Sequence, residues 1–193
     1  DLYKAAKLYS PMDDTCAGLF RFVEFLEENP LNKRSLIPKG GNDKIMTPPS
    51  LAKTIVDYFQ PWGFCLEPCR GDSAFTDAMF PYARVLDYCE LDEGLDFLES
   101  KLSKYDWIIT NPPFSKIRKF LIKSMQVANN IVFLCPSNHL LGLKARKRDI
   151  SEAGFHFREV VWVEKPIEWP SSGFSYAAIY LSKIAGDCKF SNL

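Results

Sequence analysis

Long hydrophobic runs and an excess of either charge are both missing from this sequence. No stretch reaches the ~18 apolar residues of a membrane-spanning helix, and the chain does not open with a basic and then apolar signal peptide. The 24 basic and 24 acidic side chains cancel. This balance argues against a protein coated with positive charge, but it is compatible with a local basic face. We therefore expect a cytoplasmic protein without membrane association.

Paired cysteines and histidines are scarce as well. The six cysteines include no C-x-x-C pair, and the two histidines, His139 and His156, lie far from the loose C-x-x-x-C spacing of Cys65 and Cys69. A zinc site needs such ligands close together. The sequence therefore predicts no metal, and its cysteines suit buried, reduced thiols.

Internal repeats and low-complexity tracts are absent too, and the 193 residues fit one domain with a small appendage. Residues 1–29 are helix-prone, and residues 30–44 form a polar connector rich in proline and glycine. We predict an N-terminal helical extension and linker over residues 1–44 and a main domain over residues 45–193.

Strands and helices alternate through this main domain. The strands are continuous apolar runs, which is typical of a parallel sheet covered on both faces. We predict an α/β fold with a mostly parallel, twisted sheet, helices on both faces and an antiparallel hairpin at the C-terminal end. The predicted helices span residues 50–59, 71–80 and 115–128, and the predicted strands span residues 63–66, 83–89, 106–110, 130–135, 160–164 and 175–182.

A stiff turn follows the predicted strand 106–110. Its sequence is Asn111-Pro112-Pro113-Phe114, and each proline biases the residue before it away from the helical region. Such a turn can aim an Asn side chain and a backbone carbonyl at one point beside an aromatic ring, which is a way to hold a planar amino group. An ordinary strand-ending turn accounts for the same residues, because Asn-Pro is a common turn dipeptide.

A second candidate site follows the first predicted strand. The loop reads Glu67-Pro68-Cys69-Arg70-Gly71-Asp72-Ser73-Ala74-Phe75. Gly71 lets the chain turn tightly, and the small residues Ser73 and Ala74 let a ligand approach the backbone. The loop is not the three-glycine dinucleotide fingerprint, and a plain strand-to-helix turn is the alternative interpretation.

Acidic residues follow the next predicted strand. Glu90 lies at its end, where an acid can accept hydrogen bonds from ribose hydroxyls, and Asp87 is a nearby competitor. Asp96 and Phe97 precede the third strand, where they could bind an adenine amino group and stack on its ring. Acidic residues on a solvated surface are the alternative.

Taken in order, these segments resemble S-adenosylmethionine-dependent amino-methyltransferases, above all the adenine-specific DNA methyltransferases, over roughly residues 45–182. The resemblance implies a Rossmann-like class I methyltransferase fold. Thr47-Pro48-Pro49 resembles the family's upstream motif, and Glu67 through Phe75 resembles its first motif, Asp-Pro-x-x-Gly-x-Gly-x-Phe. The cofactor-binding residues it implies are Thr47, Glu67, Pro68, Cys69, Gly71, Ala74, Phe75, Glu90, Asp96 and Phe97.

This sequence departs from the family pattern in two places. Arg70 stands where a small residue is usual, and Asp72-Ser73 stands where the second glycine is usual. The stretch from Glu90 to Asp96 is also short, which indicates that a helix between the second and third strands is missing.

The turn at Asn111 to Phe114 matches the family's catalytic motif, [Asp/Asn/Ser]-Pro-Pro-[Tyr/Phe/Trp]. The resemblance implies methyl transfer from S-adenosylmethionine to the exocyclic amino group of adenine in DNA. Asn111 and the Pro112 carbonyl would accept the two amino hydrogens, Pro113 would stiffen the turn, and Phe114 would stack on the base. A base in duplex DNA must first be flipped out.

Two basic groups follow strand ends on the side of this turn. They could neutralise phosphates, although a solvated helix face is the alternative. The loop 166–174 could wall the base pocket with Trp169 and Phe174, and a plain hairpin connection is the alternative. The predicted nucleic-acid contacts are Lys116, Arg118, Lys144, Arg146, Lys147, Arg148 and Trp169.

The acceptor stays open at the level of sequence. No separate recognition domain is evident, so we expect low specificity, a contribution from the N-terminal helices or a separate specificity subunit, with DNA favoured over RNA as the partner. The alternatives are an RNA adenine methyltransferase, a protein glutamine methyltransferase and a non-catalytic methyltransferase-like subunit that binds nucleic acid.

Overall fold

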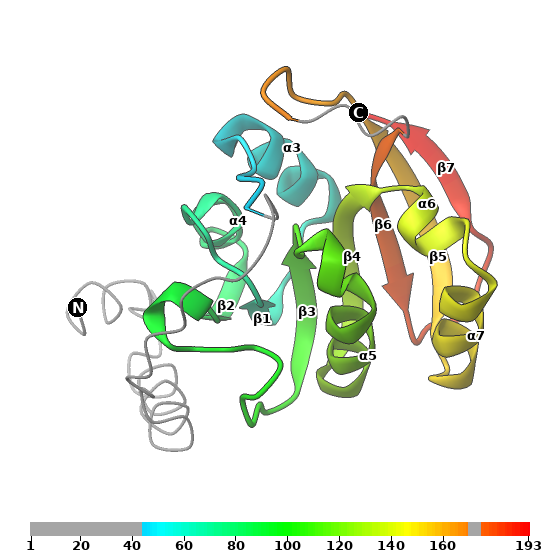
Figure 1. Cartoon of the computed structure of the whole chain (residues 1–193), viewed down its shortest axis with the longest axis horizontal. Helices are drawn as coiled ribbons and strands as arrows, with labels where there is room; N and C mark the ends of the chain where they lie inside the picture. The colour runs from blue at the N-terminus through cyan, green and yellow to red at the C-terminus, as the bar shows by residue number, and fades with distance from the viewer. Residues whose placement is uncertain (1–43, 170–174) are drawn as a thin grey trace.

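The computed structural model describes residues 44–169 and 175–193, which form a seven-stranded sheet flanked by helices (Figure 1). The predicted extension over residues 1–44 lies outside the described residues except for Lys44. In chain order the elements are α3 (Pro49–Phe59), β1 (Gly63–Glu67), α4 (Ala74–Met79), β2 (Ala83–Tyr88), η1 (Leu91–Glu93), β3 (Tyr105–Thr110), η2 (Phe114–Lys116), α5 (Ile117–Val127), β4 (Ala128–Pro136), α6 (Asn138–Leu141), α7 (Lys144–Glu152), β5 (His156–Val163), β6 (Tyr176–Ser182) and β7 (Lys189–Asn192).

The strand order in the sheet is β2-β1-β3-β4-β6-β5-β7. Strands β1, β2, β3 and β4 pair in parallel, and β6 is antiparallel to both of its neighbours, β4 and β5. Strand β6 is therefore the reversed strand of an otherwise unidirectional sheet. This arrangement confirms the mostly parallel sheet and the antiparallel C-terminal hairpin.

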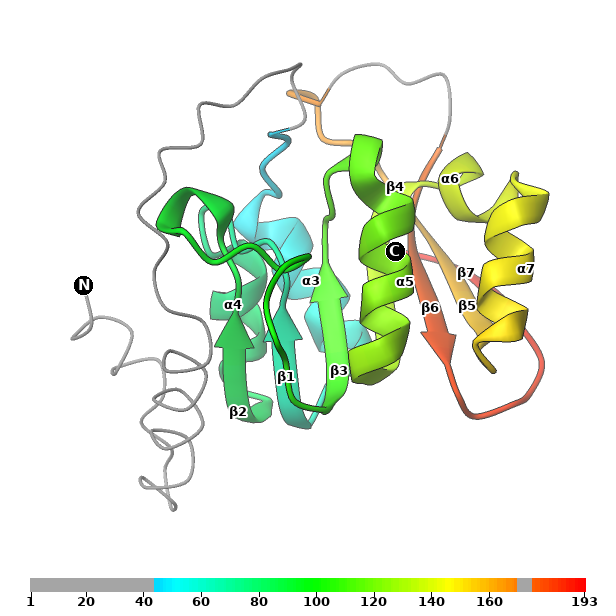
Figure 2. The same cartoon turned by 60° about the horizontal axis from the view of Figure 1, so that its bottom comes forward.

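Helices cover both faces of the sheet, as predicted. On one face α3 and α4 bury Ile55, Val56, Phe75 and Met79 against the strands. On the other face α5, α6 and α7 supply the larger core cluster (Figure 2). Burial on both sides explains why the central strands are continuous apolar runs.

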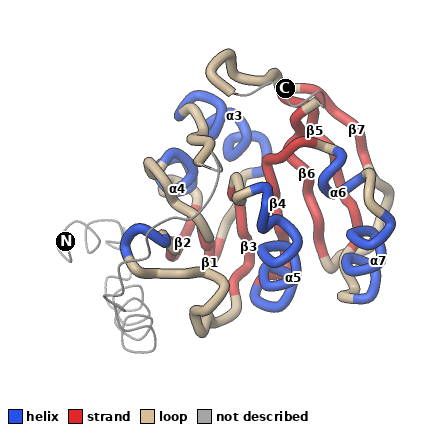
Figure 3. Tube along the Cα trace, in the orientation of Figure 1, coloured by secondary structure: helices blue, strands red, loops and turns tan. Residues whose placement is uncertain are grey.

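Helix α4 and strand β7 differ from the predictions. Helix α4 begins at Ala74 rather than at residue 71, because Gly71 (φ 51°) and Ser73 (φ 72°) adopt left-handed backbone that a helix excludes. Strand β7 was not predicted, because Lys-Phe-Ser-Asn carries no apolar run. From β5 to β7 the described strands follow one another without a helix (Figure 3).

The connection from β2 to β3 is as short as the sequence indicated. Its described helical content is the three-residue η1. Strand β2 is consequently the edge of the sheet on that side.

The carboxyl ends of β1, β2 and β3 face one edge of the sheet (Figure 2). Ligands of open α/β sheets bind at this edge. The segment Lys44–Pro48, which leads into α3, lies there too (Figure 2). Within the described residues no helix is long and apolar enough to cross a membrane, and no cluster of His, Cys, Asp or Glu could hold a metal ion.

Candidate functional site

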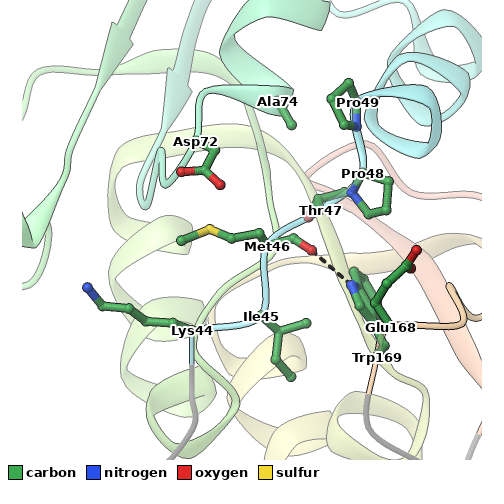
Figure 4. A pocket seen from close by; sticks show the side chains of 10 residues that line it. All are labelled: Lys44, Ile45, Met46, Thr47, Pro48, Pro49, Asp72, Ala74, Glu168 and Trp169. Carbon is green, nitrogen blue, oxygen red and sulfur yellow. Dashed lines mark hydrogen bonds between the residues drawn. The ribbon is translucent and has the colours of Figure 1, made fainter.

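A cleft of about 650 Å³ opens at the carboxyl edge of the sheet. It is lined by Lys44, Ile45, Met46, Thr47, Pro48, Pro49, Asp72, Ala74, Glu168 and Trp169 (Figure 4). A smaller hollow of about 30 Å³ adjoins it, and Cys69, Gly71, Phe75 and Asn111 line that hollow together with several of the same residues. Binding sites for small molecules and cofactors are commonly clefts of about 300–1,000 Å³.

The loop after β1 is tied to the end of β2 by hydrogen bonds. Glu90 accepts from the Gly71 backbone N–H through Oε2 (2.7 Å) and from the Asp92 N–H through Oε1 (3.2 Å). The Arg70 N–H donates to the Cys89 carbonyl (3.0 Å). The predicted ribose-binding acid thus lies beside the predicted cofactor loop, and it also holds that loop in shape.

Ser73 occupies the position of the family's second glycine. Its φ of 72° and ψ of 9° are left-handed, a conformation that costs most non-glycine residues roughly 1–2 kcal/mol. The backbone of the loop therefore keeps a glycine-like turn although the glycine is absent. Gly71 is also left-handed, with a φ of 51°, which favours glycine at this position.

Glu67, at the end of β1, is a buried acid behind the loop and lines neither the cleft nor the hollow. Burial raises the pKa of its carboxyl group to about 8. Its Oε1 accepts from the Cys69 N–H (3.1 Å), and its Oε2 has no hydrogen-bond partner among the described residues. A cation beside Glu67 would favour the ionised form.

Asn111 stands at the end of β3, beside this loop. Its Nδ2 donates to the Ile45 carbonyl (2.9 Å) and to the Thr47 hydroxyl (3.1 Å). Its Oδ1 is buried and accepts no hydrogen bond within the described part of the chain. A buried polar atom without a partner is rare and calls for an explanation, and an unused acceptor is what a bound amino group would require.

The rest of the turn is held by packing. Pro112 is buried and Pro113 is half-buried. The Phe114 ring is half-buried and lies against His139 (5.6 Å between centroids) and Tyr176 (6.1 Å). The turn is therefore backed by aromatic side chains from α6 and from the start of β6.

Cys69 connects the two motifs. Its Sγ lies 2.9 Å from Thr110 Oγ1 and 3.4 Å from the Asn111 carbonyl oxygen. Burial raises the pKa of this thiol well above its usual value, so Cys69 stays protonated and can donate to that carbonyl.

Phe97 and Asp96 lie in the connection before β3, as expected, but their side chains do not form the predicted adenine site. Phe97 is 1% exposed and packs on Phe120 in the core (5.2 Å between centroids). Asp96 accepts from the Leu98 N–H (2.8 Å), and neither residue lines the cleft or the hollow. The prediction that Phe97 offers a stacking face is corrected, because an aromatic side chain so close to the short β2–β3 connection is drawn into the core.

Trp169 lines the cleft but offers little surface for a base. It is 5% exposed, its ring packs edge-on against Tyr176 (4.9 Å), and its Nε1 donates to the Met46 carbonyl (2.8 Å; Figure 4). Trp169 therefore forms part of the cleft wall, and its small exposed surface leaves little room for the predicted direct contact with nucleic acid. Phe174, which lies in the same loop, is outside the described residues.

The predicted basic groups are only partly available. Arg118 forms a bidentate pair with Asp149 (2.8 and 3.0 Å) across α5 and α7, and Arg146 is half-buried. Arg148 lies 3.9 Å from Glu152 on α7. Lys116, Lys144 and Lys147 are exposed, and they form no such ion pair with the residues that the structure describes.

Four lining residues outside the quoted motifs were missed in the sequence, namely Lys44, Ile45, Met46 and Glu168. Ile45 and Met46 directly precede Thr47-Pro48-Pro49, and this adjacency was the available signal. Nothing in the local sequence distinguishes Glu168, because its position at the cleft depends on how the connection after β5 returns to the sheet.

No protein-family model and no curated protein matches this sequence. Solved structures match its fold. A Listeria monocytogenes protein, provisionally described as a class I S-adenosylmethionine-dependent methyltransferase, aligns with a TM-score of 0.62 at 13% identity over 80% of this chain and 68% of its own. The EcoKI M protein of a type I restriction enzyme aligns with a TM-score of 0.57 at 14% identity over 73% of this chain and 44% of its own.

A third match spans nearly the whole of both chains. Magnesium protoporphyrin IX methyltransferase from Synechocystis PCC 6803, solved with bound S-adenosylmethionine, has a TM-score of 0.54 at 9% identity over 94% of this chain and 97% of its own. These similarities confirm the Rossmann-like class I methyltransferase fold. The chain spans less than half of the EcoKI M protein.

Proposed function

We propose that this domain transfers a methyl group from S-adenosylmethionine to the exocyclic amino group of adenine in DNA. The observation that supports this most directly is the amide of Asn111. Its nitrogen is held by Ile45 and Thr47, and its oxygen is a buried acceptor without a partner beside the cofactor-type loop. The type I modification protein among the matching folds supports DNA as the acceptor.

The cleft suits the proposed cofactor. S-adenosylmethionine, when bound, supplies an electrophilic methyl group on a positively charged sulfur. Glu67 would face positive charge as a carboxylate, Glu90 would accept from ribose hydroxyls, and Gly71 would let the backbone approach closely. Thr47 and Ala74 line the hollow next to Asn111, which keeps the methyl donor and the acceptor adjacent.

Asn111 would then act on the acceptor nitrogen. The adenine amine is a poor nucleophile because its lone pair is delocalised into the ring. Hydrogen bonds from the amine to Asn111 Oδ1 and to the Pro112 carbonyl would favour a tetrahedral nitrogen with an exposed lone pair, and Phe114 would hold the base by stacking. Positioning of this kind needs no strong base.

The nucleic acid would lie over the amino-terminal ends of α5 and α7. Lys116, Lys144 and Lys147 are exposed there, and each phosphate contact contributes to a salt-dependent affinity. Because phosphate contacts carry no sequence information, sequence specificity would come from a separate subunit.

Methyl transfer from labelled cofactor to separate pools of DNA, RNA and protein tests the proposal. We expect label in DNA, on the adenine N6 atom. Label in RNA adenine or in protein glutamine would show that the protein is a methyltransferase whose acceptor is not DNA. Failure of the folded protein to bind S-adenosylmethionine or its demethylated product in calorimetry would leave only a non-catalytic subunit.

The phosphate contacts have their own test. Lys144→Glu combined with Lys147→Glu should weaken DNA binding and lower the log–log salt slope by about 0.7 to 0.9 for each phosphate that the protein no longer neutralises. Lys183→Glu combined with Lys189→Glu makes the same change of charge near the opposite edge of the sheet, and it should leave the slope unchanged. Equal slopes for the two double variants would place the DNA elsewhere.

A further inference from the structure

The amide group of Asn111 is held in one orientation. Of its two acceptors, the Ile45 carbonyl oxygen cannot donate a proton. The amide nitrogen must therefore face Ile45, since the flipped amide would set two oxygens against each other. Thr47 Oγ1 accepts the second N–H (3.1 Å). With both donors used, the amide oxygen is directed away from the segment Ile45–Thr47.

This segment is itself fixed from the other side. The Met46 carbonyl, between the two acceptors, takes a hydrogen bond from Trp169 Nε1 (2.8 Å). In Figure 4 the Met46 side chain extends toward the loop that contains Asp72, whereas the Met46 carbonyl points toward the indole of Trp169. Trp169 is buried against Tyr176, so its N–H is a firm anchor rather than a mobile surface group.

Three hydrogen bonds thus join parts of the chain that are far apart in sequence. Ile45 and Thr47 precede Asn111 by 66 and 64 positions, and Met46 precedes Trp169 by 123 positions. The connection after β5 holds the segment, and the segment holds the amide of the turn after β3. We propose that Ile45–Thr47 orients Asn111 for the acceptor amine, with Thr47 and Trp169 as positioning residues.

This inference rests on the proposed methyl transfer, and it assigns these residues to the chemical step rather than to cofactor affinity. An acceptor atom must be placed to within a fraction of an ångström to act on a reacting nitrogen. If one of these hydrogen bonds is lost, Asn111 is still present but its side-chain amide can rotate. The rate of transfer should fall while the binding of S-adenosylmethionine stays nearly constant.

Substitutions at Thr47 test this directly. Thr47→Val keeps the branched shape and removes the acceptor, and it should lower kcat roughly threefold to tenfold, the loss expected for one neutral hydrogen bond. Thr47→Ser keeps the hydroxyl and should restore most of the rate. A parallel loss of cofactor affinity in Thr47→Val, not rescued by serine, would make Thr47 a cofactor contact and overturn the proposal.

Trp169→Phe removes the N–H and keeps a ring against Tyr176. We expect a lower melting temperature, because a buried ring becomes smaller, and a reduced kcat at temperatures well below unfolding. The loss in a Thr47→Val/Trp169→Phe double variant should be smaller than the product of the single losses, because both act through one segment. Trp62→Phe makes the same change at an exposed position and should have no effect. Fully multiplicative losses would refute a shared segment.

The orientation of Asn111 can also be measured without activity. Its side-chain amide protons should exchange slowly with solvent in the nuclear magnetic resonance spectrum, and one of them should exchange faster in Thr47→Val. Fast exchange in the wild-type protein would overturn the positioning proposal. Slow exchange in a protein that transfers no methyl group would uphold the positioning and refute the proposed function instead.

Discussion

The loop after β1 and the turn after β3 end neighbouring parallel strands, yet they are shaped by different means. The first is shaped by backbone. Gly71 and Ser73 adopt left-handed conformations, and backbone N–H groups bond to Glu67 and Glu90. The second is shaped by side chains, since Asn111 is oriented by acceptors more than sixty residues earlier in the chain.

The difference shows how each half of a two-substrate site tolerates change. A loop defined by backbone can lose a glycine and keep its course, at the cost of strain at Ser73. A turn defined by side chains depends on each donor and acceptor, because a single amide has one useful orientation. We therefore expect substitutions in the turn to act mainly on rate, and substitutions in the loop to act mainly on stability and binding.

Asn111→Ala should have the largest effect. It removes the acceptor proposed to act at the reacting nitrogen, and the loss of one such group typically lowers kcat by about 10²–10³-fold. Cofactor affinity in calorimetry should hardly change. Asn129→Ala, at an exposed position at the start of β4, serves as the control. A rate for Asn111→Ala within a few-fold of wild type would reduce the motif to a structural turn.

Glu67→Gln should come next, through the pH dependence of stability. Glu67 has a pKa of about 8 in the folded protein against ~4.3 when unfolded. The folded state therefore holds the extra proton between these values, and stability falls as pH rises through this window. We expect the free energy of unfolding to drop by up to about 1.4 kcal/mol per pH unit toward pH 8.

The free energy of unfolding of the Glu67→Gln variant should not fall in this way as the pH rises. The control variant Glu99→Gln, at an exposed position, should show the same fall as the wild-type protein. Denaturant unfolding at pH 5, 6.5 and 8 measures the slopes. Identical slopes in wild type and Glu67→Gln would show that the carboxyl group titrates normally and that the loop does not bury an acid.

Ser73→Gly should have the smallest effect, and it should be stabilising. Glycine adopts a φ of 72° without the strain of a Cβ, which is partly offset by its greater freedom in the unfolded chain. A net gain of about 0.5–1 kcal/mol is expected. Ser73→Ala keeps the strain and should give no gain. A gain in both variants would trace the effect to the lost hydroxyl group and not to the backbone.

Local sequence was informative about elements and motifs. Continuous apolar runs predicted the strands β1 to β4 and β6, and Pro and Asn at a strand end predicted the turn at Asn111. The family resemblance implied that Thr47, Gly71 and Asn111 serve one site, and all three line the small hollow. These features depend on near neighbours in the chain and on the rule that parallel strands end at one edge.

The direction in which each side chain points was decided by the tertiary structure. Phe97 is drawn into the core, Arg118 is paired with Asp149, and Trp169 turns inward to Met46. Each outcome depends on a partner from a distant element, so no local pattern contains it. The sequence determined which groups gather at the carboxyl edge of the sheet. Packing between elements decided which of their atoms lack a hydrogen-bond partner among the described residues, because those partners come from elements that are distant in the sequence.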